Sequence, residues 1–372
     1  MAESTRLVDL VQEGIDGFLS DRAAELVAIA PELGMVTDVA SDFLSGGKRF
    51  RALFCYWGWQ SASGLPDGFD PMPTDTASAD LPGVVLAASA LEIFHAAALV
   101  HDDIMDKSDT RRGSLSAHRR FEEIHAQEGW AGSSATYGGS AALLLGDLLL
   151  GWSDELFDAG TALLSPDAAR AGRAEFARMR TEVTAGQYLD ILEENAWAAF
   201  PEKDALGRAH RVIVYKSAKY SVEAPLAIGA ALGGATEAQL ESLRAFGLPL
   251  GVAYQLRDDL LGVFGDPEVT GKPAGDDLRE GKRTVLIALA RTTLPTQARN
   301  LLDELLGDPE LDRQQVDIIR TALRDCGAVA HVERIIDHNV GVARDVLASA
   351  PLAASARAQL LQLADTVTRR IA

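Results

Sequence analysis

Cysteine is scarce in this sequence, and so are the motifs of several common enzyme classes. Only two cysteines occur in 372 residues, Cys55 and Cys326, and neither has histidine or cysteine neighbours at metal-ligand spacing. This excludes a disulfide framework and a zinc site and favours a reducing cytoplasm. The first residues also lack the order of a secretory signal, so we expect a cytoplasmic protein. Serine-histidine-aspartate and Walker-type patterns are missing, which leaves hydrolase and nucleoside-triphosphate functions unsupported.

Basic residues are outnumbered. Lysine and arginine contribute 35 residues against 54 acidic ones, a formal net charge of -19. Such a surface argues against nucleic-acid binding and against docking on anionic lipid. The most apolar run, residues 84–100, is interrupted by Glu92 and His95, so we predict a buried helix and no stable membrane insertion.

The alternating pattern of β-strands is scarce as well. Apolar residues recur instead at three- and four-residue steps, as in Leu7, Leu10, Val11 and Ile15. We predict an all-α fold that forms one domain over residues 1–372. The predicted helices cover roughly residues 4–30, 34–60, 84–107, 115–127, 139–163, 167–195, 203–233, 236–264, 282–306, 311–326 and 328–370. Loops are predicted over residues 64–83, 128–138, 196–205 and 265–283.

Two aspartate clusters stand out against this apolar helical background. Asp102 and Asp106 are four residues apart and share a helix face, with Asp103 at its edge. Negative charges at a helix C-terminus are unfavourable, and a divalent cation would offset them. Carboxylates completed by phosphate oxygens and water are the usual ligands of Mg²⁺. A solvated acidic helix end is the alternative interpretation.

The second cluster, Asp258 and Asp259 after Gln255, is embedded in an apolar helix. Charged residues are seldom buried without partners. A second carboxylate wall facing the first would clamp one diphosphate through bridging metals.

Basic groups accompany both clusters. Gly46-Gly47-Lys48-Arg49-Phe50-Arg51 opens a helix and places Lys48 and Arg51 on one face, where a helix N-terminus favours an anion. Arg111 and Arg112 directly follow the first aspartates and can reach a phosphate held there. His95 lies two turns before Asp102 on the same face, although a lone histidine there can equally be a core residue. Four lysines accompany the second cluster: Lys216, Lys219, Lys272 and Lys282.

In this combination and order, the motifs resemble those of the trans-isoprenyl diphosphate synthases, or polyprenyl synthetases. The resemblance runs from about Asp42 to Thr284 and rests on the Gly46–Arg51 segment, on Asp102-Asp103-Ile104-Met105-Asp106 with Arg111-Arg112-Gly113, and on Tyr254-Gln255-Leu256-Arg257-Asp258-Asp259. It implies an all-α bundle of antiparallel helices around a central apolar cavity. It also implies a prenyltransferase that condenses isopentenyl diphosphate with an allylic diphosphate.

The resemblance further implies which residues take part. Isopentenyl diphosphate would be held by Lys48, Arg51, His95 and Arg112. The allylic diphosphate would be held by Arg111, Lys216, Ser217, Gln255, Lys272 and Lys282. Two or three Mg²⁺ ions would bind Asp102, Asp106 and Asp258, with Asp103 and Asp259 as weaker ligands or orienting groups. Gln187 and Asp190 match a family segment near the cavity.

Two positions depart from the family pattern. Gly262 stands where many relatives have a fifth-position aspartate in the second cluster, and Asp266 is a possible substitute. Ser217 stands where threonine is common, and it keeps the hydroxyl group.

Product length in this family depends on side chains below the first aspartates. Ala97 and Ala98 lie about one turn below Asp102 and are small, which favours products longer than C15. Phe94 lies one more turn down, about 5.4 Å deeper, and we predict that it forms the floor and limits the product to C20. If Phe94 instead points into the core, a product of C25 or longer is expected.

Two further alternatives are a class I terpene cyclase and a non-catalytic partner subunit of a synthase. Cyclases carry a different second motif and lack Lys48 and Arg51, and partner subunits have damaged aspartate motifs. The resemblance also implies a homodimer, for which the alanine- and leucine-rich helix predicted at 139–163 is the candidate interface.

Overall fold

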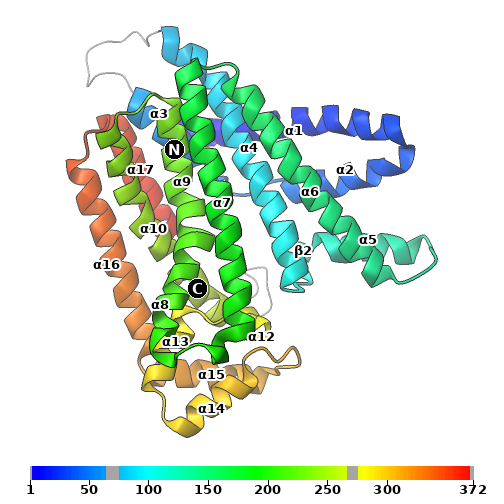
Figure 1. Ribbon diagram of the computed structural model, residues 1–372, viewed down its shortest axis with the longest axis vertical. Helices are drawn as coiled ribbons and strands as arrows, with labels where there is room; N and C mark the ends of the chain where they lie inside the picture. The colour runs from blue at the N-terminus through cyan, green and yellow to red at the C-terminus, as the bar shows by residue number, and fades with distance from the viewer. Residues whose placement is uncertain (1, 64–74, 266–274, 369–372) are drawn as a thin grey trace. The chain divides into compact units, whose positions relative to one another are not determined.

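The computed structural model describes residues 2–63, 75–265 and 275–368, and most of them are helical (Figure 1). The chain divides into two compact units, Met1–Arg173 with Ile228–Ala235, and Ala174–Ala227 with Thr236–Ala372. Within the described ranges the only strands are the two-residue pair β1 (Thr110–Arg111) and β2 (Ser114–Leu115), which form an antiparallel hairpin. The all-α prediction is therefore confirmed.

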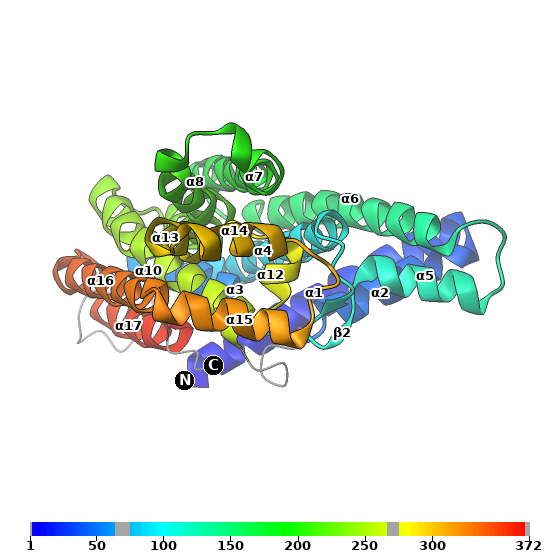
Figure 2. The ribbon, with the colours of Figure 1, turned by 90° about the horizontal axis from the view of Figure 1, so that it is seen from below.

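The first unit is built around α4 (Asp75–Met105). Along this helix pack α6 (Ser134–Thr161), α3 (Phe50–Ser63) and α1 (Ala2–Ile29), and α5 (Ala117–Gln127) lies beside α6 (Figure 2). Glycines allow α4 and α6 to approach closely, because a Cβ on Gly160 would lie only 2.7 Å from the carbonyl oxygen of Gly83. The unit also contains η1 (Pro31–Leu33) and α2 (Gly34–Leu44).

The apolar character of α4 has a structural explanation. Its segment Ala79–Met105 is the one helix in the described residues that is long and apolar enough to cross a membrane, yet 78% of its most apolar window is buried inside the protein. Val84, Ala87, Ala90 and Ile93 are fully buried. This is the burial expected of a core helix, as the sequence predicted.

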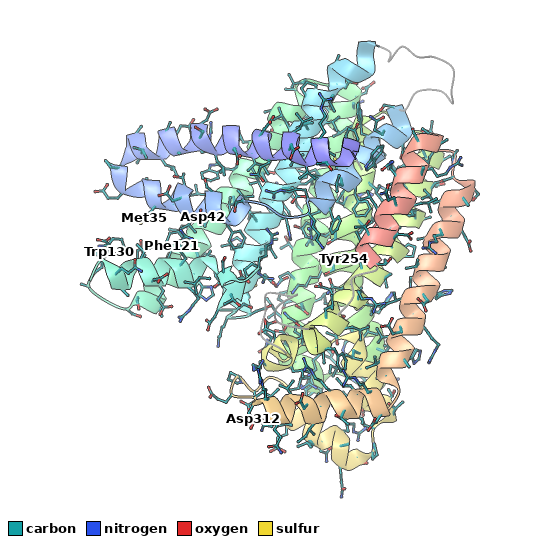
Figure 3. All side chains as sticks on the ribbon, turned by 180° about the vertical axis from the view of Figure 1, so that it is seen from behind. Met35, Asp42, Phe121, Trp130, Tyr254 and Asp312 are labelled. Carbon is teal, nitrogen blue, oxygen red and sulfur yellow. The ribbon has the colours of Figure 1, made fainter. Side chains whose placement is uncertain are left out.

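The second unit is centred on α10 (Glu237–Phe264), which packs against the π-helix η4 (Ile213–Glu223), α16 (Ala328–Ser349) and α17 (Ala354–Thr368). The short helix α13 (Val285–Thr293) contributes its first six residues, 285–290, to the buried core of this unit. Asp312, labelled in Figure 3, caps α15 (Arg313–Asp325) by accepting a hydrogen bond from the Gln315 amide at 2.8 Å. The other elements are α7 (Pro166–Ala196), which begins in the first unit, η2 (Trp197–Ala199), η3 (Glu202–Asp204), α8 (Ala205–Val212), α9 (Ala224–Leu232), α12 (Asp276–Glu280) and α14 (Thr296–Leu305).

Three predicted helices are interrupted in the structure. The predicted helix 34–60 breaks between α2 and α3, where Gly46, Gly47 and Arg49 have positive φ angles of 65°, 98° and 48°. Pro295 separates α13 from α14 within predicted helix 282–306, and Pro351 follows the end of α16 within 328–370. Proline lacks the amide hydrogen that a continuing helix requires.

Several predicted loops are partly helical. Helix α4 begins at Asp75 inside predicted loop 64–83, and α12 lies inside predicted loop 265–283. Helix α6 begins at Ser134 inside the glycine- and serine-rich stretch 128–138, because Ser133 accepts a capping hydrogen bond from the Thr136 amide at 3.3 Å. Packing and capping therefore override composition at these positions.

Candidate active site

The first aspartate cluster ends helix α4. The Asp106 amide donates a hydrogen bond to the Asp102 carbonyl at 2.8 Å, so the helical repeat continues one residue beyond Met105. Asp102 and Asp106 therefore share a face, and both are partly exposed. Asp103, between them in sequence, is fully buried. The three carboxylates thus have two different environments.

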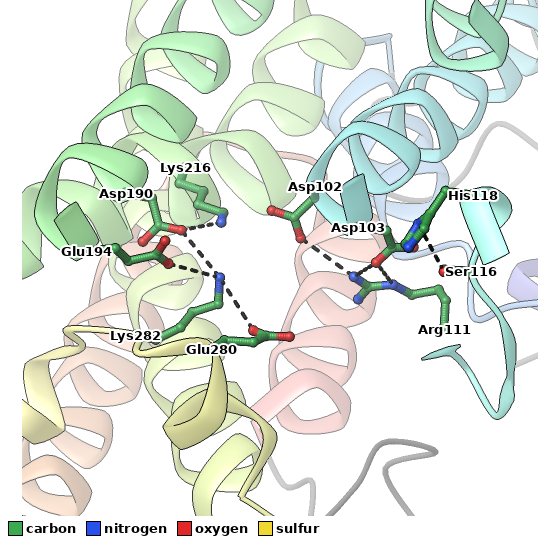
Figure 4. Close-up of polar contacts among 10 residues, drawn as sticks. All are labelled: Asp102, Asp103, Arg111, Ser116, His118, Asp190, Glu194, Lys216, Glu280 and Lys282. Carbon is green, nitrogen blue, oxygen red and sulfur yellow. Dashed lines mark hydrogen bonds and ion pairs between the residues drawn. The ribbon is translucent and has the colours of Figure 1, made fainter. Parts of the chain in front are cut away.

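Arg111 compensates the charge of buried Asp103 (Figure 4). Its Nε donates a hydrogen bond to Asp103 Oδ1 at 2.9 Å, its Nη2 contacts the same oxygen, and Nη2 lies 3.6 Å from Asp102 Oδ2. The hairpin after α4 positions this guanidinium, since Arg112 and Gly113 turn the chain with φ angles of 53° and 79°. Arg111 therefore orients the aspartates, while its predicted contact with the allylic diphosphate stays a prediction.

A basic cluster lies in the same unit. The guanidinium of Arg112 lies against the backbone of Gly47, where an added Cβ would be 3.4 Å from Nη1. Burial, together with the positive charges of Arg51 and Arg112, lowers the pKa of His95 well below its usual value. The His95 ring is therefore neutral at pH 7. The structure thus brings His95 together with Arg51 and Arg112, three of the residues predicted to hold isopentenyl diphosphate. Lys48 is exposed in the loop that precedes Arg51, and its contact with the same diphosphate stays a prediction.

Sequence reasoning missed the pair that holds this loop. Arg49 and Glu92 are both buried, and Arg49 Nη1 lies 3.5 Å from Glu92 Oε2. Glu92 Oε1 also accepts a hydrogen bond from the Ala52 amide at 3.1 Å, and Arg49 donates to the Gln12 side chain at 2.5 Å and to the Leu44 carbonyl. The signal was available, because a glutamate inside the most apolar run of the sequence requires a partner.

In the second unit, two lysines share a group of carboxylates (Figure 4). Lys216 contacts Asp190, and Lys282 Nζ lies 3.6 Å from Asp190, 3.4 Å from Glu194 and 3.6 Å from Glu280. The structure thus brings together Asp190, Lys216 and Lys282 as expected of one site. Glu194 and Glu280 were not predicted, since nothing in their local sequence distinguishes them from surface glutamates.

Lys216 and Ser217 belong to the π-helix η4. Glycines on both neighbouring helices accept this wider turn: a Cβ on Gly186 of α7 would lie 2.7 Å from Lys216 Cα, and one on Gly251 of α10 would lie 2.7 Å from Ala218 Cα. π-helical turns occur frequently at functional sites. The backbone of Lys216 and Ser217 is therefore fixed by close contact with α7 and α10.

The two aspartates of the second cluster also differ in exposure. Asp258 is exposed, whereas Asp259 is buried and accepts a hydrogen bond from Gln255 Nε2 at 2.7 Å. Burial raises the pKa of Asp259 to about 7, against the opposing effect of the Gln255 hydrogen bond. Asp258 is the member of the pair that reaches the surface. Lys272 and Asp266 lie outside the described residues.

The remaining predicted residues take several positions. Lys219 lies 2.7 Å from Glu182, in an ion pair on the α7 side of η4. Gln187 is half-buried. Ala97 is fully buried and Phe94 is 3% exposed, whereas Ala98 keeps partial exposure. Of the two small residues, Ala98 is therefore the one accessible beneath Asp102.

The carboxylates fit magnesium. Within the described ranges no group of three or more histidine, cysteine, aspartate or glutamate side chains forms a ready-made metal cage. Asp102 and Asp106 instead offer hard oxygen donors on one face, and Asp258 offers another on the second unit. Mg²⁺ is commonly held by one or two carboxylates, with water and substrate phosphates completing its shell.

The described residues thus form an all-α fold that carries two aspartate clusters, each accompanied by basic side chains. The polyprenyl synthetase family profile matches residues 34–323. The chain is 34% identical to a geranylgeranyl pyrophosphate synthase of Corynebacterium glutamicum, whose crystal structure with isoprenyl diphosphate and magnesium has a TM-score of 0.90 and covers 98% of this chain and 99% of that one.

Two relatives of known product class extend this similarity. A geranylfarnesyl diphosphate synthase of Aeropyrum pernix is 30% identical over 88% of this chain and 91% of its own length. A nonaprenyl diphosphate synthase of Mycobacterium tuberculosis is 30% identical over 91% and 89%. The chain therefore belongs to the polyprenyl synthetase family. The predictions of an isoprenoid synthase fold and of a trans-prenyltransferase are confirmed.

Proposed function

We propose that this enzyme condenses isopentenyl diphosphate with an allylic diphosphate in a magnesium-dependent reaction and that its main product is the C20 geranylgeranyl diphosphate. One observation carries the proposal. Helix α4 presents Asp102 and Asp106 on one face, and two turns earlier it presents neutral His95 beside Arg51 and Arg112. One helix thus offers groups for a metal-held diphosphate and for a second, arginine-held one.

The residues divide by charge. Arg51, Arg112 and Lys48 would bind the diphosphate of isopentenyl diphosphate, since guanidinium groups match phosphate oxygens in two-point contacts. Neutral His95 would add a hydrogen bond there without adding charge. Lys216 and Lys282 would exchange their carboxylate partners for oxygens of the allylic diphosphate, with Gln255 and Ser217 orienting it.

The reaction would begin with cleavage of the allylic carbon–oxygen bond. Bound Mg²⁺, as two or three ions on Asp102, Asp106 and Asp258, would neutralise the charge that develops on the leaving diphosphate. The lysines would stabilise the same charge. The double bond of isopentenyl diphosphate would then attack the allylic cation, and the released diphosphate would take the proton that is lost.

The C20 product rests on the residues below Asp102. Accessible Ala98 leaves room for a growing chain, and Phe94 one turn deeper would end it. A longer product, C25 or more, is the second candidate, because Phe94 is only 3% exposed and a side chain packed into the core would not close the cavity.

The variant Phe94→Ala tests whether Phe94 closes the bottom of the cavity that holds the growing prenyl chain. We expect the product to lengthen by at least one C5 unit, because one helical turn, about 5.4 Å, is the reach of one isoprene unit. Products are separated by chain length after incubation with isopentenyl diphosphate and C5, C10 or C15 primers. Unchanged C20 output would remove Phe94 as the floor, and a main product of C25 or more from the wild type would refute the C20 assignment.

The same assay tests the two remaining alternatives. Turnover of an allylic diphosphate without isopentenyl diphosphate would favour a terpene cyclase. Absence of turnover by the purified chain alone would favour a non-catalytic partner subunit. Prenyl elongation by the purified chain contradicts both.

We also propose a cytoplasmic homodimer. Leu143 and Leu144 of α6 are 51% and 62% exposed, and adjacent exposed leucines favour an interface. Light scattering of the purified chain measures the mass: a monomer would contradict the dimer, and in a dimer Leu144→Glu is expected to cause dissociation.

A further inference from the structure

Gly262 occupies the place of the last carboxylate in the second aspartate cluster. It lies inside helix α10 and is not among the residues with positive φ, so its backbone makes no special demand for glycine. Glycine is required at this position because of the atoms that lie next to it. A Cβ built on Gly262 would lie 2.7 Å from Asp277 Oδ1 and closer still to the other atoms of that carboxyl group.

The Asp277 carboxylate therefore occupies the space that a side chain at position 262 would fill. Positions 258 and 262 are four residues apart and share one face of α10. Asp258, the exposed member of the pair, is thus followed one turn later by a carboxylate that comes from another helix. The spacing reproduces that of Asp102 and Asp106 on α4.

Helix α12 holds Asp277 in this place. Its Leu278 side chain is 1% exposed in the core of the second unit, and the Leu278 carbonyl accepts a hydrogen bond from the Gly307 amide at 2.8 Å. Gly275 and Gly281 bound the helix with φ angles of 76° and 80°. The carboxylate is thus carried by an anchored element.

We propose that Asp277 supplies the third carboxylate of the second cluster and, directly or through water, holds a Mg²⁺ ion together with Asp258. This inference rests on the proposed function. It assigns to α12 a role that the α10 sequence lacks, and it makes the glycine at 262 a requirement for the site, where the sequence alone presents it as a loss.

Calorimetry of Mg²⁺-dependent binding of inorganic diphosphate tests the assignment without turnover. Asp277→Asn is expected to weaken this binding about 10-fold or more, the range for groups that support a metal ligand. Asp276→Asn, the adjacent change in the same short helix, serves as the control and should bind like the wild type. Circular dichroism and thermal melting of each variant establish that it is folded.

A carboxylate swap provides the second arm. Gly262→Asp alone should weaken binding, because its side chain collides with Asp277, whereas Gly262→Asp combined with Asp277→Ala should recover most of the lost affinity. Recovery supports the proposal even if Asp277→Asn is poorly stable.

Three results would overturn the proposal. In the first, Asp277→Asn binds like the wild type while Asp258→Asn is weakened, and the proposed function then stands. In the second, Asp266→Asn is weakened in place of Asp277→Asn, which would assign the role to Asp266. In the third, the wild type shows no Mg²⁺-dependent binding at all, and the proposed function falls together with this inference.

Discussion

The two aspartate clusters differ in how the surrounding residues stabilise a buried carboxyl group. Each contains one buried aspartate beside an accessible one: Asp103 beside Asp102, and Asp259 beside Asp258. The positively charged guanidinium of Arg111 forms an ion pair with Asp103. The neutral side-chain amide of Gln255 donates a hydrogen bond to Asp259, and burial raises the pKa of Asp259 to about 7.

This difference shows that a shared motif does not imply the same partner for its buried carboxylate. A charged partner and hydrogen bonds favour the ionised form of a carboxylate, whereas burial opposes it. At Asp259 burial outweighs the hydrogen bond from Gln255 and raises the pKa to about 7. The charge of Asp259 therefore depends on pH near neutrality.

Asp102→Asn is expected to have the largest effect. It removes one of two accessible carboxylates from the end of α4, and we expect turnover to fall about 1000-fold, as follows the loss of a major charge-stabilising group. Steady-state assays at saturating Mg²⁺ measure this loss. Asp109→Asn, which changes an exposed aspartate beyond the cluster, is the control. Undiminished turnover of Asp102→Asn would refute the metal assignment.

The next largest effect is expected from Arg111→Ala, which should lower the free energy of unfolding. It leaves Asp103 buried without its cation, which costs about 3 kcal/mol in the free energy of unfolding. Chemical denaturation measures the change. The matched control is Arg120→Ala, whose partner Asp42 is 56% exposed, and it should cost less than about 1 kcal/mol. Equal effects of the two variants would contradict the contrast between the buried and exposed ion pairs.

The effect of Asp259→Asn should depend on pH, and it should be smallest in acid, where the carboxyl is protonated in both the native and the unfolded state. The carboxyl titrates near 3.8 when unfolded and near 7 when folded, so between these values the native state holds a proton that the unfolded chain has lost. Stability therefore falls as pH rises from about 4 to about 7, by about 1.4 kcal/mol for each unit of the difference. The asparagine variant should lack this pH dependence, so at pH 8 its free energy of unfolding should exceed that of the wild type.

Denaturation at pH 5 and pH 8 in the presence of a chelator measures this gain. Glu241→Gln, which changes an exposed carboxyl on the same helix α10, is the control. If Asp259→Asn follows the pH profile of the wild type, the raised pKa of Asp259 is wrong.

The sequence predicted what depends on local geometry. The shared face of Asp102 and Asp106 follows from helical periodicity, and most helix ends fell within a few residues of their predicted positions. What it missed depends on distant partners. Glu92 holds Arg49 from 43 positions away, and the Asp277 carboxylate meets Gly262 only after α12 has packed. Helix α4 extends back to Asp75 through a segment whose prolines and glycines predicted a loop, because tertiary packing outweighs composition.

Gly186 has a consequence for how this enzyme tolerates mutation. Its hydrogen atom faces the backbone of Lys216, so even one methyl group would push that lysine out of place. In a library selected for activity, position 186 should accept almost no replacement, as strictly as the aspartates that carry charge. A residue without a side chain can thus be as essential to an active site as a residue that carries a reactive group.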